Sequence, residues 1–267
     1  MRLSKNEIYS SILKKEIRES LEIIILESIG STNNEAKNNL KNKLNKKEFV
    51  AILSEKQTSG RGRGKNKWVS PKGKNIYLSL GFNSALKLIE LEALSLSVAV
   101  VISKKLNELI NKKIYLKWPN DLFLEEKKVG GILIESISQK NKSIKIVIGI
   151  GINISMSKAE GEEIDQQWES LEAYLINGIN RNNIIGSILE TLIKLINNYE
   201  IRGFSFYKKD FENLNILHLK KCIASTDKYK VTGIVKGVTN KGELIFETNE
   251  NTRLLKYGEV TLRKSEE

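Results

Sequence analysis

The segment from Ser54 to Trp68 concentrates residues that bind anions. Glycines at 60, 62 and 64 alternate there with Arg61 and Arg63. Glycine lets a backbone approach a ligand closely, and guanidinium groups present planar donors that fit carboxylates and phosphates. From 61 to 74 the chain carries six basic residues and no acidic one. The segment therefore predicts a local anion site. A solvated RGG-type nucleic-acid segment is the alternative, which the strands expected on both sides disfavour.

A second block pairs Lys117-Trp118-Pro119-Asn120-Asp121 with the run from Lys128 to Glu135. We expect Asp121 and Lys128 on either side of a hairpin-like turn over 122–127. The turn opens into a strand that begins with tandem glycines at 130 and 131, which permit close ligand approach. A solvated turn with scattered lysines would explain Lys127, but neither Trp-Pro-Asn-Asp nor the tandem glycine.

Two shorter motifs are weak when taken alone. Gly149 and Gly151 precede Asn153 in an apolar run, but no third glycine opens a helix, so this is not a dinucleotide fingerprint. Ser31-Thr32-Asn33 follows Gly30 at an expected helix start, and Thr32 and Glu35 have the spacing of a capping box. By itself such an N-cap is more often structural than functional.

In this order, these blocks resemble the signature of the biotin protein ligases, from about residue 26 to 263. The resemblance implies that Ser-Thr-Asn binds the ureido ring of biotin, that the glycine strand floors its pocket, and that a Trp and an Ile cover the adenine. The implied biotin-binding residues are Ser31, Thr32, Asn33, Gln57, Gly60, Arg61, Gly62, Arg63, Lys128, Gly131, Gly149 and Gly151. The implied ATP-binding residues are Arg61, Arg63, Trp68, Asn120, Lys128, Asn153, Ile164 and Trp168.

The family's reaction has two steps, which the resemblance extends to this chain. Biotin and ATP give biotinyl-5'-adenylate and pyrophosphate, and the acyl group then passes to a lysine of biotin carboxyl carrier protein. The biotin carboxylate is ionised at neutral pH, so its attack on phosphorus requires charge neutralisation and not a base. The expected catalytic residues are Lys128, Arg63 and Asp121. Mg²⁺ is expected with ATP, but no pattern identifies its ligands or the base for the acceptor lysine.

The elements that position these residues predict an α+β protein. The resemblance implies a mixed-sheet catalytic domain over 1–218, similar to class II aminoacyl-tRNA synthetases, and a small SH3-like β-barrel over 219–267 that contains Gly258-Glu259-Val260. Apolar periodicity predicts one short N-terminal helix over 3–19. Further helices are expected at 88–110, 169–176 and 181–212, and strands at 21–26, 49–53, 76–82, 113–118, 129–138 and 143–154.

Composition excludes several classes of protein. With 267 residues, 40% hydrophobic and 28% charged, the chain is typical of a globular protein. It has neither a bilayer-length apolar run nor a secretory signal, so we expect a cytoplasmic protein that does not bind membranes. The chain has one cysteine, Cys222, and one histidine, His218. These counts disfavour a disulfide scaffold, a zinc finger and a papain-like hydrolase. Of the formal charge of +12, two thirds falls within 51–130.

Some alternatives stay open at this point. A lipoate ligase would share the fold and the two-step chemistry, but its Arg-Arg-x-x-Gly-Gly-Gly pattern is absent. A basic nucleic-acid-binding module would use the same glycine-rich segment. Here Gly64-Lys65-Asn66-Lys67 stands where the family often has Arg-Gly-Arg, which leaves open which cation meets the phosphates. Only about twenty residues precede the catalytic part, so we expect a monofunctional ligase without specific DNA binding. A homodimer is left open.

Overall fold

The computed structural model describes residues 2–42, 47–138, 144–176, 178–225, 230–256 and 261–264. A seven-stranded mixed sheet forms its centre, in the order β1-β2-β3-β7-β6-β5-β4. β1 and β2 pair in parallel, and the other neighbours are antiparallel. The mixed α+β architecture expected from the sequence is confirmed. The strands are β1 (Leu21–Leu26), β2 (Phe49–Ser54), β3 (Ile76–Ser84), β4 (Ile114–Lys117), β5 (Asp121–Leu124), β6 (Lys127–Ser138) and β7 (Ile144–Ile152).

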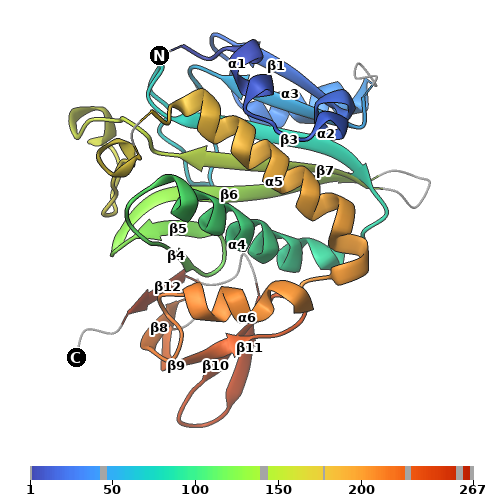
Figure 1. Ribbon diagram of the computed structural model, residues 1–267. Helices are drawn as coiled ribbons and strands as arrows, with labels where there is room; N and C mark the ends of the chain where they lie inside the picture. Colours follow the sequence, from blue (N-terminus) through green and yellow to red (C-terminus); the bar gives the residue numbers. More distant parts are fainter. Residues whose placement is uncertain are drawn as a thin grey trace.

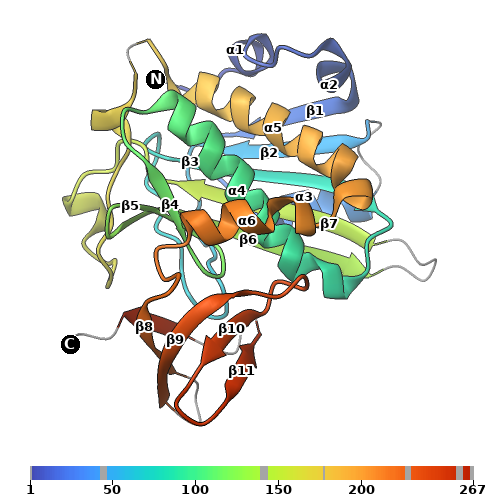
Figure 2. The ribbon, with the colours of Figure 1, turned by 60° about the horizontal axis from the view of Figure 1, so that its bottom comes forward.

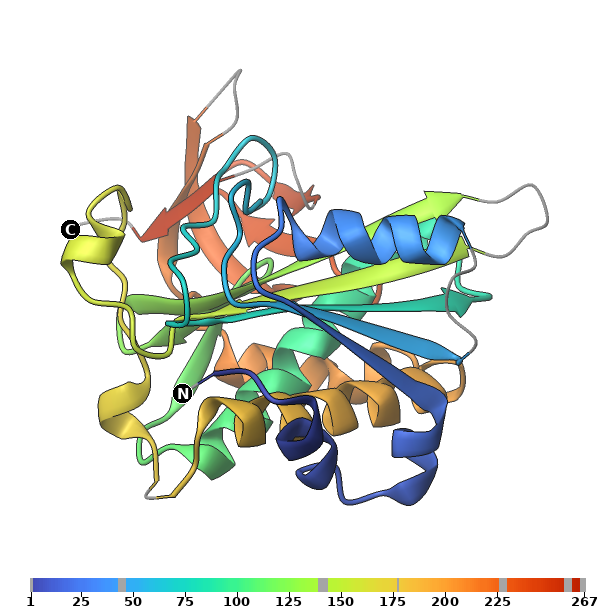
Figure 3. The ribbon, with the colours of Figure 1, turned by 90° about the horizontal axis from the view of Figure 1, so that it is seen from above.

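Helices cover both faces of this sheet (Figure 3). The long helices α4 (Leu91–Leu109) and α5 (Arg181–Arg202) lie on one face, and α3 (Thr32–Lys41) lies on the other. A short 3₁₀ turn, Leu88–Glu90, leads into α4. Because both faces are covered, the central strands are mostly apolar, and every residue of β2 is buried. A large hydrophobic core lies on the side of the sheet that α4 and α5 cover, and a smaller cluster lies under α3.

The N-terminal segment differs from the expectation. The single helix predicted over 3–19 is wrong: two short helices form, α1 (Lys5–Ser10) and α2 (Lys15–Ser20). Tertiary hydrogen bonds separate them, because the Leu13 N–H donates to the Glu190 carboxylate and the Arg18 guanidinium donates to the Ile12 carbonyl. These bonds occupy a backbone N–H and a backbone carbonyl that would otherwise form hydrogen bonds within a continuous helix.

Three other predictions about helices also differ from the structure. The helix predicted over 181–212 is two helices, α5 and α6 (Ser205–Leu214), because the chain turns at Gly203 with φ of 58°. The helix predicted over 169–176 is reduced to a 3₁₀ turn at Glu172–Tyr174. The predicted capping box does not form, since Ser31 is the N-cap of α3 and the Thr32 hydroxyl donates to Gln57 instead. A further 3₁₀ turn spans Ala159–Gly161.

A second, five-stranded sheet follows α6 and packs at one end of the main sheet (Figures 1 and 2). Its neighbouring strands are antiparallel in every pair. The indole of Trp118 reaches it and donates to the Gly242 carbonyl at 3.0 Å. The motif at 258–260 lies outside the described residues. The strands are β8 (Lys221–Ser225), β9 (Lys230–Val238), β10 (Leu244–Glu247), β11 (Thr252–Leu255) and β12 (Thr261–Lys264).

Candidate active site

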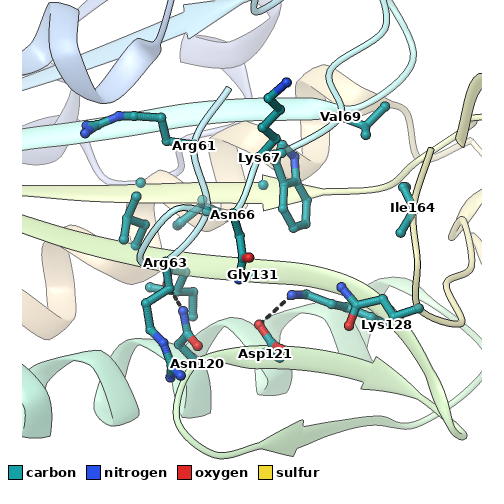
Figure 4. Close-up of a pocket in the computed structure, with 18 of the residues that line it drawn as sticks. Arg61, Arg63, Asn66, Lys67, Val69, Asn120, Asp121, Lys128, Gly131 and Ile164 are labelled. Carbon is teal, nitrogen blue, oxygen red and sulfur yellow. Dashed lines mark hydrogen bonds and ion pairs between the residues drawn. The ribbon is translucent and has the colours of Figure 1, made fainter. Parts of the chain in front are cut away.

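A cavity of about 690 Å³ opens on the α3 side of the main sheet (Figure 4). Its walls come from the start of α3, the segment 56–74 between β2 and β3 (hereafter the glycine loop), the β5–β6 hairpin, β7 and the segment 163–168. The predicted residues that line it are Ser31, Thr32, Asn33, Gln57, Arg61, Gly62, Arg63, Trp68, Asn120, Asp121, Lys128, Gly131, Gly149, Gly151, Asn153, Ile164 and Trp168. Motifs more than 100 residues apart therefore meet in one place.

A chain of polar side chains crosses one wall of the cavity. The Ser79 hydroxyl, buried on β3, lies 2.5 Å from Asn33 Oδ1 and 2.8 Å from the Thr32 hydroxyl. Gln57 Oε1 accepts from the Thr32 N–H at 2.9 Å, and Gln57 Nε2 donates to Ser70. These bonds fix the orientation of both amide side chains, so the wall presents an ordered row of donors and acceptors to a ligand.

Glu135 gathers three donors at the end of this row. Its carboxylate accepts from Asn33 Nδ2 at 2.8 Å, from Lys37 Nζ at 2.9 Å and from Arg61 Nη2 at 2.5 Å. Burial by itself would raise the pKa of Glu135, but the hydrogen bonds from Asn33, Lys37 and Arg61 outweigh it and hold the pKa below its usual range. An ionised Glu135 therefore orients Asn33 and holds Arg61 in place.

The glycines of β6 and β7 admit side chains that cross the sheet. A Cβ at Gly149 would overlap the Asn33 amide, and one at Gly151 would lie 2.5 to 2.7 Å from the Trp68 ring. At Gly131 the nearest ring atom of Trp68 would be 3.3 Å away. Trp68 thus lies flat across the glycine floor, with its indole N–H buried and without a partner among the described residues.

Gly60 is the one predicted site residue that does not line the cavity. A Cβ there would overlap the Trp68 carbonyl and lie 2.7 Å from the Ser70 hydroxyl. A close approach within the loop therefore requires glycine at this position. Gly60 shapes the loop that carries Arg61 and Arg63.

The β5–β6 hairpin brings a cation and a carboxylate together. Lys128 Nζ lies 2.8 Å from Asp121 Oδ1, and both side chains are mostly buried. The ammonium group is also 5.5 Å from the centroid of the Trp68 ring. Nearby, burial lowers the pKa of Lys117, with Asp121 opposing that change and Lys128 adding to it. The hairpin expected between Asp121 and Lys128 is confirmed, with a tighter turn than predicted.

The segment after β7 closes the other side of the cavity. Its backbone pairs with Lys128, whose N–H donates to the Gln167 carbonyl and whose carbonyl accepts from the Glu169 N–H, both at 3.0 Å. Trp168 is only 8% exposed because it packs on Gly161, with Lys158 Nζ 4.3 Å from its ring centroid. Asn153 Nδ2 donates to the Glu169 carbonyl at 3.3 Å.

Several lining or supporting residues were missed by the sequence analysis. Ser79 is a single polar residue between two leucines, and Lys37 is one of several polar residues on α3. For Glu135 the alternation along β6 was a signal, since Gly131 and Glu135 share a face. From the second sheet, Leu262 and Arg263 of β12 line the cavity mouth.

Among the described residues, no group of three His, Cys, Asp or Glu side chains is placed to hold a metal ion. None of the described helices has the length and apolar character to span a membrane.

The fold and the cavity together define a ligase of the biotin/lipoate class. Residues 25–153 match the Biotin/lipoate A/B protein ligase family. The chain is 31% identical over 217 residues to the bifunctional ligase/repressor BirA of Escherichia coli, which covers 81% of this chain and 67% of that protein. It is 29% identical over 239 residues to the Bacillus subtilis protein of the same name, covering 89% and 72%.

A solved structure agrees with these relatives. The biotin protein ligase from Aquifex aeolicus, in complex with biotin and ATP, superposes with a TM-score of 0.76 at 27% identity, covering 91% of this chain and 99% of that one. The chain belongs to the biotin protein ligase family and is an enzyme of that ligase type. The lipoate-ligase and nucleic-acid alternatives are not favoured.

Proposed function

We propose that this enzyme activates biotin with ATP and transfers it to a lysine of a biotin carboxyl carrier protein. The observation that carries the proposal is the convergence of the two motifs, 60–68 and 117–128, with the polar row of α3 in a single cavity. Such a cavity suits a ligand with a polar head, an apolar body and a carboxylate. The related Aquifex enzyme, solved with biotin and ATP, supports this choice of substrates.

Biotin lies along the polar row in this proposal. Its ureido head hydrogen-bonds Ser31, Thr32, Asn33 and Gln57. Its ring system lies beside the Trp68 ring, over the strands β6 and β7 that carry the glycines at 131, 149 and 151. Because Ser79 and Glu135 already fix the amide of Asn33, binding requires little reordering of the head-group site. The carboxylate then points toward the guanidinium groups of Arg61 and Arg63.

The nucleotide lies between the glycine loop and the 163–168 segment. Asn120, Asn153, Ile164, Trp68 and Trp168 contact it, and Lys128 faces its α-phosphate. A carboxylate oxygen of biotin attacks that phosphorus, an O–P bond forms, and the bond to pyrophosphate breaks. Lys128 and Arg63 stabilise the charge that shifts onto the phosphoryl and pyrophosphate oxygens. Asp121, in contact with Lys128, holds the ammonium group in position.

In the second step the neutral amine of the acceptor lysine attacks the acyl carbon of the adenylate. A C–N bond forms, the bond between the acyl carbon and AMP breaks, and the nitrogen loses a proton. Asp121 lies at the cavity mouth and orients this amine. The carrier's domain therefore docks against the hairpin and the adjacent β12.

Mg²⁺ accompanies ATP in this scheme. Among the described residues, three carboxylates line the cavity: Asp121, which is paired with Lys128, and Glu163 and Asp165 on the segment after β7. Because Mg²⁺ commonly keeps several waters and binds through one or two carboxylates and substrate phosphates, this set is compatible with the ion. When bound, it would neutralise phosphate charge.

Three structural and partner assignments complete the proposal. The seven-stranded unit is of the class II aminoacyl-tRNA synthetase type, and the five-stranded antiparallel unit is an SH3-like barrel; the topology supports both. This polypeptide does not bind specific DNA, because α1 and α2 bury Ile8 and Ile17 against the enzyme and present no free helix pair. A homodimer is compatible with the place of β1 at the edge of the main sheet.

The test is a transfer assay. The protein is incubated with ATP, Mg²⁺, labelled biotin and a carrier domain, and label is sought on the carrier. Parallel titrations with biotin and lipoate separate the two ligase types. Biotin-dependent label on the carrier is the expected result; preference for lipoate, or no transfer with either acid, would refute the proposal.

A further inference from the structure

Arg181, the first residue of α5, lies outside the cavity but contacts both ends of the glycine loop. Its Nη2 donates to Glu55 Oε2 at 2.6 Å, and its Nη1 donates to the Asn75 carbonyl at 3.2 Å. Glu55 immediately precedes the loop and Asn75 immediately follows it. Both members of the ion pair are almost fully buried, with side chains 5% and 4% exposed.

Glu55 and Asn75, the two partners of Arg181, also hydrogen-bond neighbouring segments. Glu55 Oε1 accepts from the Leu3 N–H at 2.6 Å, and the Glu55 carbonyl accepts from the Gly73 N–H at 2.9 Å. The side chain of Asn75 accepts from the Ile154 N–H at 3.0 Å, next to Asn153 and just after β7, the strand that carries Gly151. One guanidinium group therefore connects the loop ends, the N-terminal segment and the chain that leads to the nucleotide side of the cavity.

The tip of the loop, 60–68, closes on itself. The Trp68 N–H donates to the Gly60 carbonyl at 3.0 Å, and the Gly62 N–H donates to the Asn66 carbonyl at 2.8 Å. A unit with such internal bonds keeps its own shape. Its position over the sheet depends on the contacts of Trp68 and Arg61 and on where its two ends are held. That position decides where Arg61 and Arg63 meet a bound anion.

We propose that Arg181 is a positioning residue, which joins Glu55 to Asn75 and thereby sets the place of the glycine-loop tip over the cavity. The inference deepens the proposed function, because its effect on binding assumes that biotin occupies the cavity. A buried ion pair contributes little net stability. It does fix the relative positions of its partners, because the planar guanidinium group holds two acceptors in a set geometry. Lysine cannot reproduce this: one ammonium nitrogen replaces two separated donor nitrogens.

Arg181→Lys and Glu55→Gln test the inference against a matched control. Glu190 is a buried carboxylate on the same helix that also accepts a backbone N–H, from Leu13, and pairs with a cation, Lys194. Glu190→Gln therefore removes a comparable interaction far from the loop. Three quantities are measured for each full-length variant: the unfolding midpoint, the biotin dissociation constant by calorimetry, and amide hydrogen exchange over 60–68 without ligand.

We expect Arg181→Lys to weaken biotin binding about tenfold or more and to speed exchange over 60–68, because small misplacements of binding groups are costly. Glu190→Gln should lower the midpoint and leave both other quantities at their wild-type values. If the Arg181 variant matches Glu190→Gln in exchange and in affinity, the inference is overturned. Should Arg181→Lys not fold, Glu55→Gln gives the same comparison. If the wild type binds no biotin, the proposed function fails, and exchange over 60–68 alone decides the role of Arg181.

Discussion

The indole of Trp68 lies directly on the backbone of Gly151, on the strand that floors the cavity. The two residues are 83 positions apart in sequence, and the contact exists because β7 carries no side chain at this point. The same ring lies near Gly131 on the neighbouring strand and 5.5 Å from the Lys128 ammonium. The Trp68 ring therefore seats the glycine loop on the sheet and places it beside the hairpin that carries Lys128.

Gly151→Ala should displace Trp68. The new methyl group would lie 2.5 to 2.7 Å from ring atoms, so the ring must move, at a cost of about 1–3 kcal/mol typical of overpacking. We expect a changed tryptophan emission spectrum and weaker biotin binding. The spectral change should vanish in a Trp68→Phe background. Gly30→Ala is the control, since its methyl group meets no atom within 4 Å. An unchanged spectrum in Gly151→Ala would contradict the contact.

Lys128→Ala should slow adenylate formation by roughly 10²- to 10³-fold, the usual effect of removing one preorganised electrostatic partner. The adjacent Lys127→Ala is the matched control, because Lys127 pairs with Glu169 at 2.8 Å and does not line the cavity. Biotin-dependent release of pyrophosphate from ATP measures the effect. Equal rates in the two variants would remove Lys128 from the mechanism.

Gly60→Val should weaken biotin binding through the shape of the loop. Any Cβ at this position overlaps the Trp68 carbonyl, so Gly60→Ala should already show part of the effect and valine more. Overpacking of about 1–3 kcal/mol corresponds to roughly 5- to 150-fold in Kd. Calorimetry with biotin measures the series. Wild-type affinity in a folded valine variant would show that the loop is free to adopt another shape at no cost.

The glycine-loop tip should exchange its amide hydrogens faster without ligand than with biotin and ATP. Its small residues bury little surface, and its basic groups repel one another until an anion binds. In the structure Arg61 is held by Glu135, which neutralises part of this charge. Exchange over 60–67 should slow on ligand addition while the buried strand β2 stays unchanged. Equal protection in both states would contradict the expectation.

The motifs of the site were predictable because each is a short run of unusual residues. Arg61, Lys128 and Gly151 lie in segments whose composition has no simple structural explanation, so sequence alone indicated a ligand site. Ser79 and Glu135 gave no such signal. Their place follows from strand register, in which Ser79 on β3 pairs with Gly149 and Glu135 on β6 pairs with Val147. The pairing of Ser79 with Gly149, 70 positions away, is not visible in local periodicity.

The errors in the helices have a related cause. Periodicity predicted apolar faces well, and Ile8, Ile12 and Ile17 are all buried. The break between α1 and α2 depends on Glu190, a residue nearly 180 positions away, whose carboxylate binds the Leu13 N–H. Tertiary hydrogen bonds of this kind override local preference. The arrangement around Arg181 was unpredictable for the same reason, since its partners belong to two distant segments.

The carboxylate of Glu135 should make the stability of the enzyme depend on acid pH. Its folded-state pKa lies below the value of about 4.3 expected in an unfolded chain. The stabilisation from ionised Glu135 is therefore complete above that pH and is lost as the pH falls through the folded-state pKa. Hydrogen bonds to a charged group contribute about 1.5–3 kcal/mol each, so Glu135→Gln should lower the free energy of unfolding by an amount of this order at pH 7.

Urea denaturation of the wild type and Glu135→Gln at pH 7 and near pH 3 measures this dependence. The difference in the free energy of unfolding between the two proteins should shrink at the lower pH, because the wild-type carboxyl is then increasingly protonated and its bonds to Lys37 and Arg61 lose their charge. Glu108→Gln is the control, since Glu108 is 63% exposed and its pair with Lys105 is of the surface kind, worth about 0–1 kcal/mol. A difference for Glu135→Gln that is the same at both pH values would show that its bonds do not depend on ionisation.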